Sequence, residues 1–307
     1  MKGGELELKK NDKTILFSIP DFYFLYDLNM LLLQIMEQEP YKFYEDVKID
    51  SIYGAFPGCI WNSGRAACGW ASIENIIGTV AAFNEKGISV RYTFTNSEIT
   101  GRHLLDYHCN TILQATGKVV DNGVQNGCNI NQAFLADYIA KNYPEFYLMW
   151  STTRGINSLA ETNKLSEDRL TVLYYGLNNT TALQGLEHPE NIEILVSEAC
   201  IENCPNRMEH YKQIGKLQLL EPSQGFTCPH GCESYFYYDK PVSRDHYVSI
   251  DDIRQVYLPL GINKFKIGGR QDHPVNLIEN YVNYLVKPDH RDDVRNRLLI
   301  TYWNMKH

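Results

Sequence analysis

The stretch IEILVSEACIENC, from Ile192 to Cys204, combines the two patterns that decide the fold and the site. Its first part is a short run of apolar and β-branched residues, which is typical of a buried strand. Cys200 and Cys204 follow this run directly. In a parallel barrel the loops at the carboxyl ends of the strands carry the active site. The stretch therefore predicts a strand whose end presents cysteines at a functional face.

Other segments of strand character flank this stretch, and amphipathic helices separate them. The predicted strands are 49–56, 88–96, 119–124, 146–153, 171–175, 192–199 and 262–269. Ser72 as an N-cap, a capping box of Ser249 with Asp252, and Pro274 in a first turn mark helix starts. Strands that alternate with helices predict a parallel sheet with right-handed crossovers.

An eighth strand would close this sheet into a (β/α)8 TIM-like barrel. We expect that strand in the aromatic run Tyr235 to Tyr238 or near Tyr247. The alternative is a doubly wound open sheet, but no G-x-G-x-x-G follows the first predicted strand. The predicted organisation is an N-terminal extension (1–48) with a helix from Leu28 to Glu37, a barrel (49–290) with a cysteine-rich insertion (200–247), and a tail (291–307).

The composition limits the class of protein. The chain has 307 residues, of which 44% are hydrophobic and 21% charged, so it can bury a large core and is not disordered. A net charge of −8 argues against a protein whose surface binds nucleic acid mainly through its phosphate groups. No apolar run is long enough for a membrane helix, and the charged MKGGELELKKNDK lacks the apolar core of a signal peptide. We therefore expect a soluble cytoplasmic protein.

Four cysteines form two matched pairs, Cys200 with Cys204 and Cys228 with Cys232. The pattern is C-x3-C, a gap of 23 residues, and C-x3-C. Four thiolates hold either a [4Fe–4S] cluster or a structural zinc ion, and the spacing leaves both open. The alternative to a metal centre is that these are four unrelated thiols. The other cysteines lie far apart in the sequence, at Cys59, Cys68, Cys109 and Cys128. We interpret Cys109 as a core residue.

Other loops of the same predicted face carry polar candidates. Arg65 ends the glycine-containing loop after the first predicted strand, and FKIGGR places two cations and two glycines at the end of the last one. Such a group suits an anionic ligand, although a turn with solvated cations would look the same. The candidates for catalysis are Glu198, Lys266 and Arg270, and those for substrate binding are Arg65, Asn96, Gly268 and Gly269.

The segment VSIDDIRQVYLPLGINKFKIGGR resembles the end of the peptidase U32 family domain through its K-I-x-G-R motif, Lys266 to Arg270. GAFPGCIWNSGRA and NEKGISVRYTFTN are similar to that family's first two β/α units, so the resemblance spans roughly residues 50–288. Two features depart from the family. Gly268 replaces the Glu of K-I-E-G-R, and C-I-E-N-C-P-N-R replaces the S-G-R-C context.

The resemblance implies a TIM-type barrel with a [4Fe–4S] cluster on Cys200, Cys204, Cys228 and Cys232. It also implies oxygen-independent hydroxylation of an RNA base or a quinone precursor, with prephenate as co-substrate and oxygen source. We therefore expect an iron–sulfur enzyme that acts on a nucleic-acid base or a small aromatic molecule. An RNA substrate would require a protein partner or a concentrated basic patch, because the chain is acidic. The alternatives are a non-catalytic barrel with structural zinc and, as the family name suggests, a peptidase.

Overall fold

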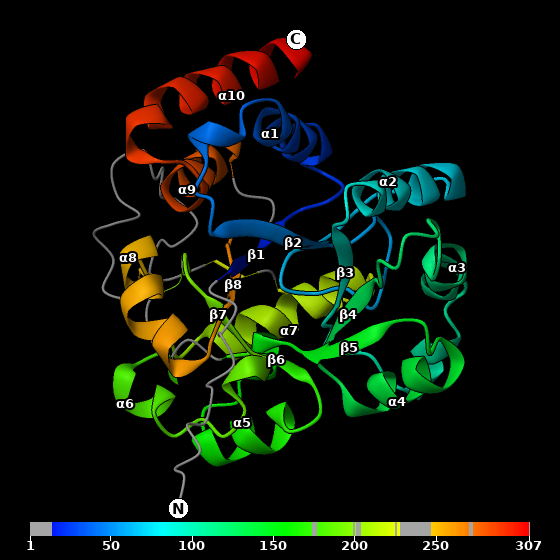
Figure 1. Cartoon of the computed structure of the whole chain (residues 1–307). Coiled ribbons are helices and arrows are strands. Elements are labelled where there is room, and N and C mark those ends of the chain that lie inside the picture. The colour runs from blue at the N-terminus through cyan, green and yellow to red at the C-terminus, as the bar shows by residue number, and fades with distance from the viewer. Residues whose placement is uncertain are drawn as a thin grey trace, which may run out of the picture.

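The strands form a closed parallel barrel in the computed structural model, which describes residues 14–173, 177–198, 200, 204–224, 226–227, 247–269 and 273–306 (Figure 1). Neighbouring strands pair in chain order, and the last strand pairs with the first. The strands are β1 Ile15–Pro20, β2 Val47–Gly54, β3 Ser89–Phe94, β4 Gly127–Ile130, β5 Tyr147–Trp150, β6 Leu170–Val172, β7 Ile192–Leu195 and β8 Lys264–Lys266. The TIM-like fold is confirmed, and the open doubly wound sheet is excluded.

Helices surround the barrel and connect its strands (Figure 1). They are α1 Tyr26–Gln38, α2 Ile73–Glu85, α3 Tyr107–Thr116, α4 Ala133–Asn142, α5 Leu159–Ser166, α6 Thr180–Leu183, α7 Arg207–Gln218, α8 Ile250–Asp252, α9 Pro274–Leu285 and α10 Arg291–Lys306. The predicted starts are confirmed, because Ser72 caps α2, Ser249 and Asp252 form a capping box, and Pro274 lies in the first turn of α9.

The strand that closes the barrel comes from the N-terminal segment, which corrects our prediction. ILFSIP, Ile15–Pro20, pairs with β2 on one side and β8 on the other. Ile15, Phe17 and Ile19 are fully buried, as expected of a strand inside a barrel wall. Tyr247 lies outside the strands, and Tyr235 to Tyr238 lie outside the described residues. The barrel therefore begins at Ile15, and β1 with α1 forms its first β/α unit.

The prediction of a strand at 119–124 is also wrong. This segment is a bend that precedes β4, because Asp121, Asn122 and Gly123 are turn residues and Gly123 has a φ of 81°. The Asn122 carboxamide donates to the carbonyl of Asn84 at 2.6 Å and holds the bend against α2. The strand itself starts at Gly127, where a Cβ atom would lie 2.4 Å from the Tyr147 ring.

A buried charged network fills the barrel toward the amino ends of the strands. Arg91 on β3 forms ion pairs with Glu193 on β7 and, at 3.3 Å, with Asp50 on β2. Its Nε atom also donates to the Tyr147 hydroxyl at 2.6 Å. Burying charges is tolerated when they are paired in this way. The network joins opposite walls of the barrel and leaves the carboxyl ends of the strands free to form a cavity.

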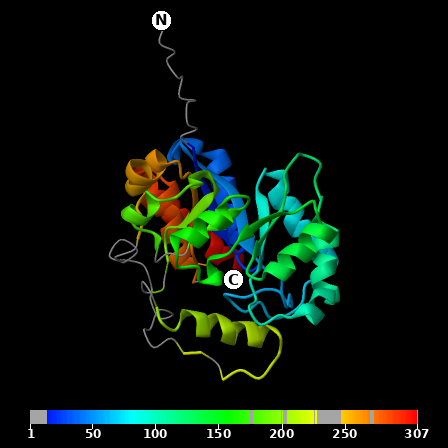
Figure 2. The same ribbon diagram turned by 90° about the horizontal axis from the view of Figure 1, so that it is seen from below.

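Helix α7, in the predicted insertion between β7 and β8, is tied to the loops at the ends of β3 and β5. The Asn96 carboxamide donates to the Gly215 carbonyl at 3.1 Å. At the other end of α7, the Met208 sulfur lies 2.7 Å from where a Cβ atom on Gly155 would be. Figure 2 shows α7 beside the barrel, seen from below the view of Figure 1. The insertion thus contributes a helix to the face that carries the strand ends.

The last helices pack together over the start of the chain. α10 contacts α1 and α9, and Figure 1 shows the three side by side. α9 buries an apolar face, because Ile278, Tyr281, Val282 and Leu285 are fully buried. Within the described residues, no helix is both long and apolar enough to cross a membrane.

Candidate active site at the barrel mouth

A cavity of about 120 Å³ opens at the carboxyl ends of the strands, the end at which barrel enzymes carry their active sites. Residues from β2, β3, β4, β7 and β8, from the loops that follow strands, and from α7 form its wall. The lining residues are Tyr53, Ser63, Gly64, Arg65, Thr93, Thr95, Asn129, Ser151, Thr152, Thr153, Leu195, Glu198, Cys200, Arg207, His210, Tyr211, Lys266, Gly268 and Gly269.

Lys266, at the end of β8, provides a buried cation in this wall. Its ammonium group lies 3.5 Å from the centre of the Tyr53 ring, and only 9% of the residue is exposed. The Tyr53 hydroxyl donates to the Ile267 carbonyl at 2.8 Å, which fixes the ring beside β8. A cation over an aromatic face is attracted by the ring quadrupole. The Lys266 charge is therefore held in a defined position at the cavity.

Glu198, Arg207 and Cys200 form a second charged group at the end of β7. The Glu198 carboxylate accepts from the Arg207 guanidinium at 2.7 Å and from the Cys200 amide at 3.1 Å. Burial raises the pKa of Glu198, but the charge and hydrogen bonds of Arg207, with the Cys200 amide, outweigh it and lower the pKa to about 2. Glu198 is therefore ionised at neutral pH, which suits an anchoring carboxylate rather than a general acid.

His210 lies on α7 at the same cavity. Its ring stacks on the Phe226 ring, with centroids 4.3 Å apart. Burial lowers the pKa of His210 to about 4, with contributions from the charges of Arg65 and Arg207. The imidazole is therefore neutral at pH 7, so it does not add to the positive charge of the wall.

Two buried polar atoms at the cavity have no hydrogen-bond partner within the described part of the chain. They are the Oδ1 atom of Asn129 on β4 and the Oγ1 atom of Thr152 after β5. Asn129 is only 1% exposed. An unpaired buried polar group costs free energy, so such groups in a cavity wall indicate a place for water or ligand.

The structure brings most of the predicted site residues of the described chain to this cavity. Arg65, Glu198, Cys200, Lys266, Gly268 and Gly269 line it. Cys204 is half-buried just before α7 and does not line the cavity. Arg270, Cys228 and Cys232 lie outside the described residues.

Asn96 is the predicted substrate-binding residue that the structure places elsewhere. It is fully buried, donates to the carbonyls of Ile60 and Gly215, and accepts from the Glu98 amide. Its carboxamide is used to hold α7 against the loops after β2 and β3. In this structure its polar atoms have backbone partners, and Asn96 is not among the residues that line the cavity.

Several residues of the site were not predicted from the sequence. Only the closed barrel brings three of them to the cavity: Arg207, Tyr53 and Asn129. The position of Asn129 on β4 was obscured because the strand itself was predicted at 119–124. For Arg207, the available signal was its place three residues after Cys204.

Among the described residues, no three side chains of the metal-binding types gather at one point. The other described cysteines give no site at the cavity: Cys59 and Cys109 are buried together, with their sulfur atoms 3.4 Å apart. Burial raises the pKa of Cys109 and of Cys128, which keeps these thiols protonated and unreactive.

No family model and no curated protein matches the chain. Its structure is similar to that of the U32 peptidase Mk0906, with a TM-score of 0.49 and 13% sequence identity. The match covers 89% of this chain and 97% of that one. A U32 peptidase is thus among the solved structures that this chain resembles.

Proposed function

We propose that this chain is an iron–sulfur enzyme whose active site is the mouth cavity. The observation that carries the proposal is the meeting of Lys266, Arg65, the Glu198–Arg207 pair and Cys200 in one cavity at the strand ends. The proposed reaction, oxygen-independent hydroxylation of a nucleic-acid base or a small aromatic substrate, comes from the U32-like sequence motifs.

The cysteines that would hold the cluster are Cys200, Cys204, Cys228 and Cys232. The two that the structure describes suit this role. Cys200 lines the cavity near Arg207, and a neighbouring cation favours the thiolate that a metal requires. Cys204 follows after three intervening residues and is half-buried. A cluster bound there would supply one-electron chemistry beside the substrate, whereas zinc would supply only structural support.

The other residues of the wall would bind and orient the substrate. In the proposal, Arg65, Lys266 and Arg270 hold an anionic group, which the implied co-substrate prephenate would provide. Glu198 positions Arg207 and the Cys200 backbone through its two hydrogen bonds. The side chains of Asn129 and Thr152 lie at the same cavity and offer polar atoms to a bound molecule.

The cavity size bears on the substrate. The volume bounded by the described residues is about 120 Å³. This suits a small molecule or a single extruded base rather than a stretch of duplex. With a net charge of −8, an RNA substrate would be delivered with the help of a protein partner. A reducing, cytoplasmic setting would preserve the cysteine thiolates.

The test is the metal content of anaerobically purified protein, measured together with its absorption spectrum. We expect about four iron and four sulfide per chain and a brown colour. Cys228→Ser should lose the visible absorption and remain folded, whereas Cys68→Ser, at an exposed cysteine outside the two pairs, should keep it.

A colourless protein with one zinc per chain would exclude the iron–sulfur proposal. The zinc alternative also predicts that Cys228→Ser unfolds the chain, because a structural zinc site contributes directly to folding. Gelatin or peptide cleavage that Cys228→Ser abolishes would instead favour the peptidase alternative.

A further inference from the structure

A second pocket lies beside the mouth cavity, between the ends of β4 and β5. Six described residues line its volume of about 210 Å³: Asn131, Gln132, Arg154, Gly155, Ile156 and Glu161. None of them lines the mouth cavity or carries sulfur. The two cavities share one wall, because Thr153 lines the mouth cavity and accepts from the Asn131 carboxamide at 3.0 Å. The pocket is therefore a neighbour of the proposed active site and is built from other residues.

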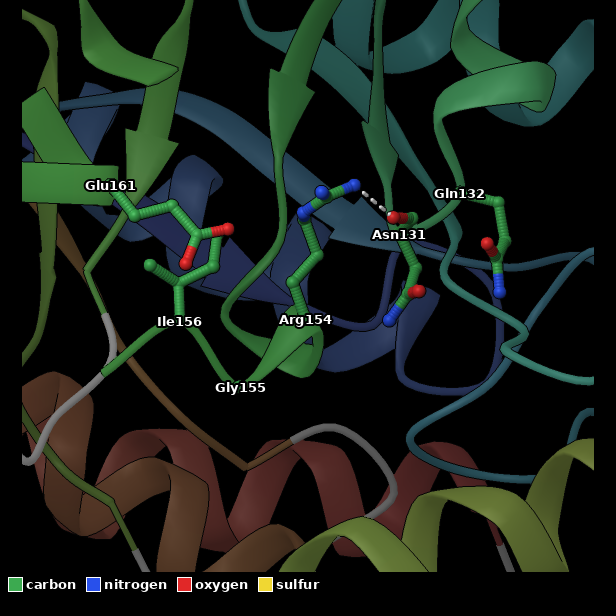
Figure 3. Close-up of a pocket in the computed structure, with 6 residues that line it drawn as sticks. All are labelled: Asn131, Gln132, Arg154, Gly155, Ile156 and Glu161. Atoms are coloured by element: carbon green, nitrogen blue, oxygen red, sulfur yellow. Dashed lines mark hydrogen bonds between the residues drawn. The ribbon is translucent and has the colours of Figure 1, made fainter. Parts of the chain in front are cut away.

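Arg154 is the cation of this pocket, and the fold fixes its position. Its guanidinium lies 4.4 Å from the centre of the Trp150 ring and donates through Nη1 to the Asn131 carbonyl. Gly155 follows in the left-handed region, with a φ of 67°, and ends the short 3₁₀ turn that carries Arg154. Figure 3 shows Arg154 between Asn131 and Glu161.

The charge of Arg154 is only partly balanced by the described residues. Its Nε atom is buried and has no hydrogen-bond partner among them. Burial lowers the pKa of Arg154, and the charge of Glu161 only partly offsets this effect. A second guanidinium, that of Arg169, lies 5.1 Å from the same Trp150 ring. Within the described chain, the Arg154 guanidinium is thus left with an unpaired donor at the pocket, and a guanidinium is stabilised when an anion completes its hydrogen bonds.

The N-terminal end of α4 lies at the pocket. Gln132, the N-cap of this ten-residue helix, lines the pocket. Its side chain makes no capping hydrogen bond and instead donates to the Ser97 carbonyl at 2.8 Å. The first amides of a helix lack acceptors within the helix and carry its positive dipole end, so they bind anions.

We propose that this pocket binds an oxyanion, the phosphate or carboxylate group of a small molecule, through Arg154 and the first turn of α4. The guanidinium fork and the helix amides are complementary to both groups. Glu161 is exposed at the rim, where its charge weakens the binding of an anion and tunes its affinity. A molecule bound here would lie next to the mouth cavity, separated from it by the residues after β5.

The test uses the full-length protein titrated with inorganic phosphate and, separately, with acetate, at constant ionic strength in isothermal titration calorimetry. Arg154→Gln should weaken binding about tenfold, because it removes the guanidinium fork. Arg169→Gln is the matched control, since Arg169 stacks on the same Trp150 ring but does not line the pocket. It should bind like the unmodified protein. Glu161→Gln should tighten binding roughly twofold to threefold, because it removes a like charge.

Binding of phosphate alone assigns a phosphoryl group, binding of acetate alone assigns a carboxylate, and binding of both supports a general oxyanion site. The proposal is overturned if neither anion binds at millimolar concentration or if Arg154→Gln binds as well as Arg169→Gln. Weaker binding by Glu161→Gln would also overturn it. Should Arg154→Gln fail to fold by circular dichroism, the direction of the Glu161→Gln effect decides, since Glu161 is exposed.

Discussion

The carboxylate of Glu198, at the end of β7, forms an ion pair of 2.7 Å with the guanidinium of Arg207, at the start of α7. The side chains are only 13% and 3% exposed. This pair connects a barrel strand to the helix of the insertion and sets the position of Cys200 through a hydrogen bond to its amide. The pair therefore links the stability of the insertion to the geometry of the proposed site.

Glu198→Gln should destabilise the fold by about 3–5 kcal/mol, because it removes the negative charge that pairs with the buried Arg207 guanidinium. Urea unfolding followed by circular dichroism measures the difference. Glu221→Gln is the control, since its ion pair with Arg102 is exposed and long, at 3.4 Å, and should cost at most about 1 kcal/mol. Equal losses of unfolding free energy in the two variants would show that the buried ion pair stabilises the fold no more than the exposed one.

His210 should make the protein less stable as the pH falls from 6.5 to 4. Burial and the charges of Arg65 and Arg207 lower the pKa of His210 from 6.5 to about 4, so the unfolded chain binds more protons in this range. Stability is then lost on acidification, by roughly 2–3 kcal/mol in total. His210→Phe keeps a ring against Phe226 and should flatten the curve of unfolding free energy between these pH values.

The same titration contains an internal control. The pKa of Glu198 is lowered from 4.5 to about 2, so the stability that its ionised form contributes is lost only as the pH falls through that lower range. His210→Phe should leave this loss of unfolding free energy at lower pH unchanged. A His210→Phe curve that falls as steeply between pH 6.5 and 4 as that of the unmodified protein would contradict the assignment.

Asn129→Leu should leave the stability within about 1 kcal/mol of the unmodified protein and abolish ligand binding at the mouth cavity. Its Oδ1 atom has no hydrogen-bond partner among the described residues, so an apolar side chain of similar volume removes an unpaired group. Thermal and urea unfolding measure the effect on stability.

Asn126→Leu is the matched substitution, at the residue directly before the same strand. The Asn126 carboxamide is buried and makes four hydrogen bonds, with Asn84, Val90 and Thr116. Its loss should cost roughly 2–4 kcal/mol. If Asn129→Leu is as destabilising as Asn126→Leu, then Asn129 is a structural residue and does not serve a ligand.

Gly215→Ala should destabilise the protein by about 1–3 kcal/mol, although alanine favours helices. The new Cβ atom would lie 2.4 Å from Oδ1 of Asn96, so α7 must move from the loop that Asn96 supports. Gly78→Ala in α2 is the control: no atom lies within 4 Å of its Cβ position, and we expect a gain of about 0.5–1 kcal/mol. A gain in both variants would mean that α7 is not held closely by Asn96.

Most of the barrel could be predicted from local sequence patterns. Short apolar runs such as IEILV, and helix starts such as Ser72 and Pro274, depend on neighbouring residues only, so they are readable along the chain. The predictions were wrong at 119–124, which is a bend, and at Ile15–Pro20, which is a strand. In both places the structure depends on contacts with distant residues more than on the local sequence pattern. The segment ILFSIP could pair with several strands as far as its sequence indicates. Only the closed sheet shows that it lies between β2 and β8.

The amino-acid sequence by itself determined the alternation of strands and helices, the paired cysteines, and the cations at the strand ends, because each is a property of neighbouring residues. Only the tertiary structure decided which side chains share a cavity. Asn96 and Asn129 have the same chemistry, yet one is bonded to backbone and the other faces the mouth cavity. That difference depends on strand register and on the packing of α7, which are contacts between residues far apart along the chain.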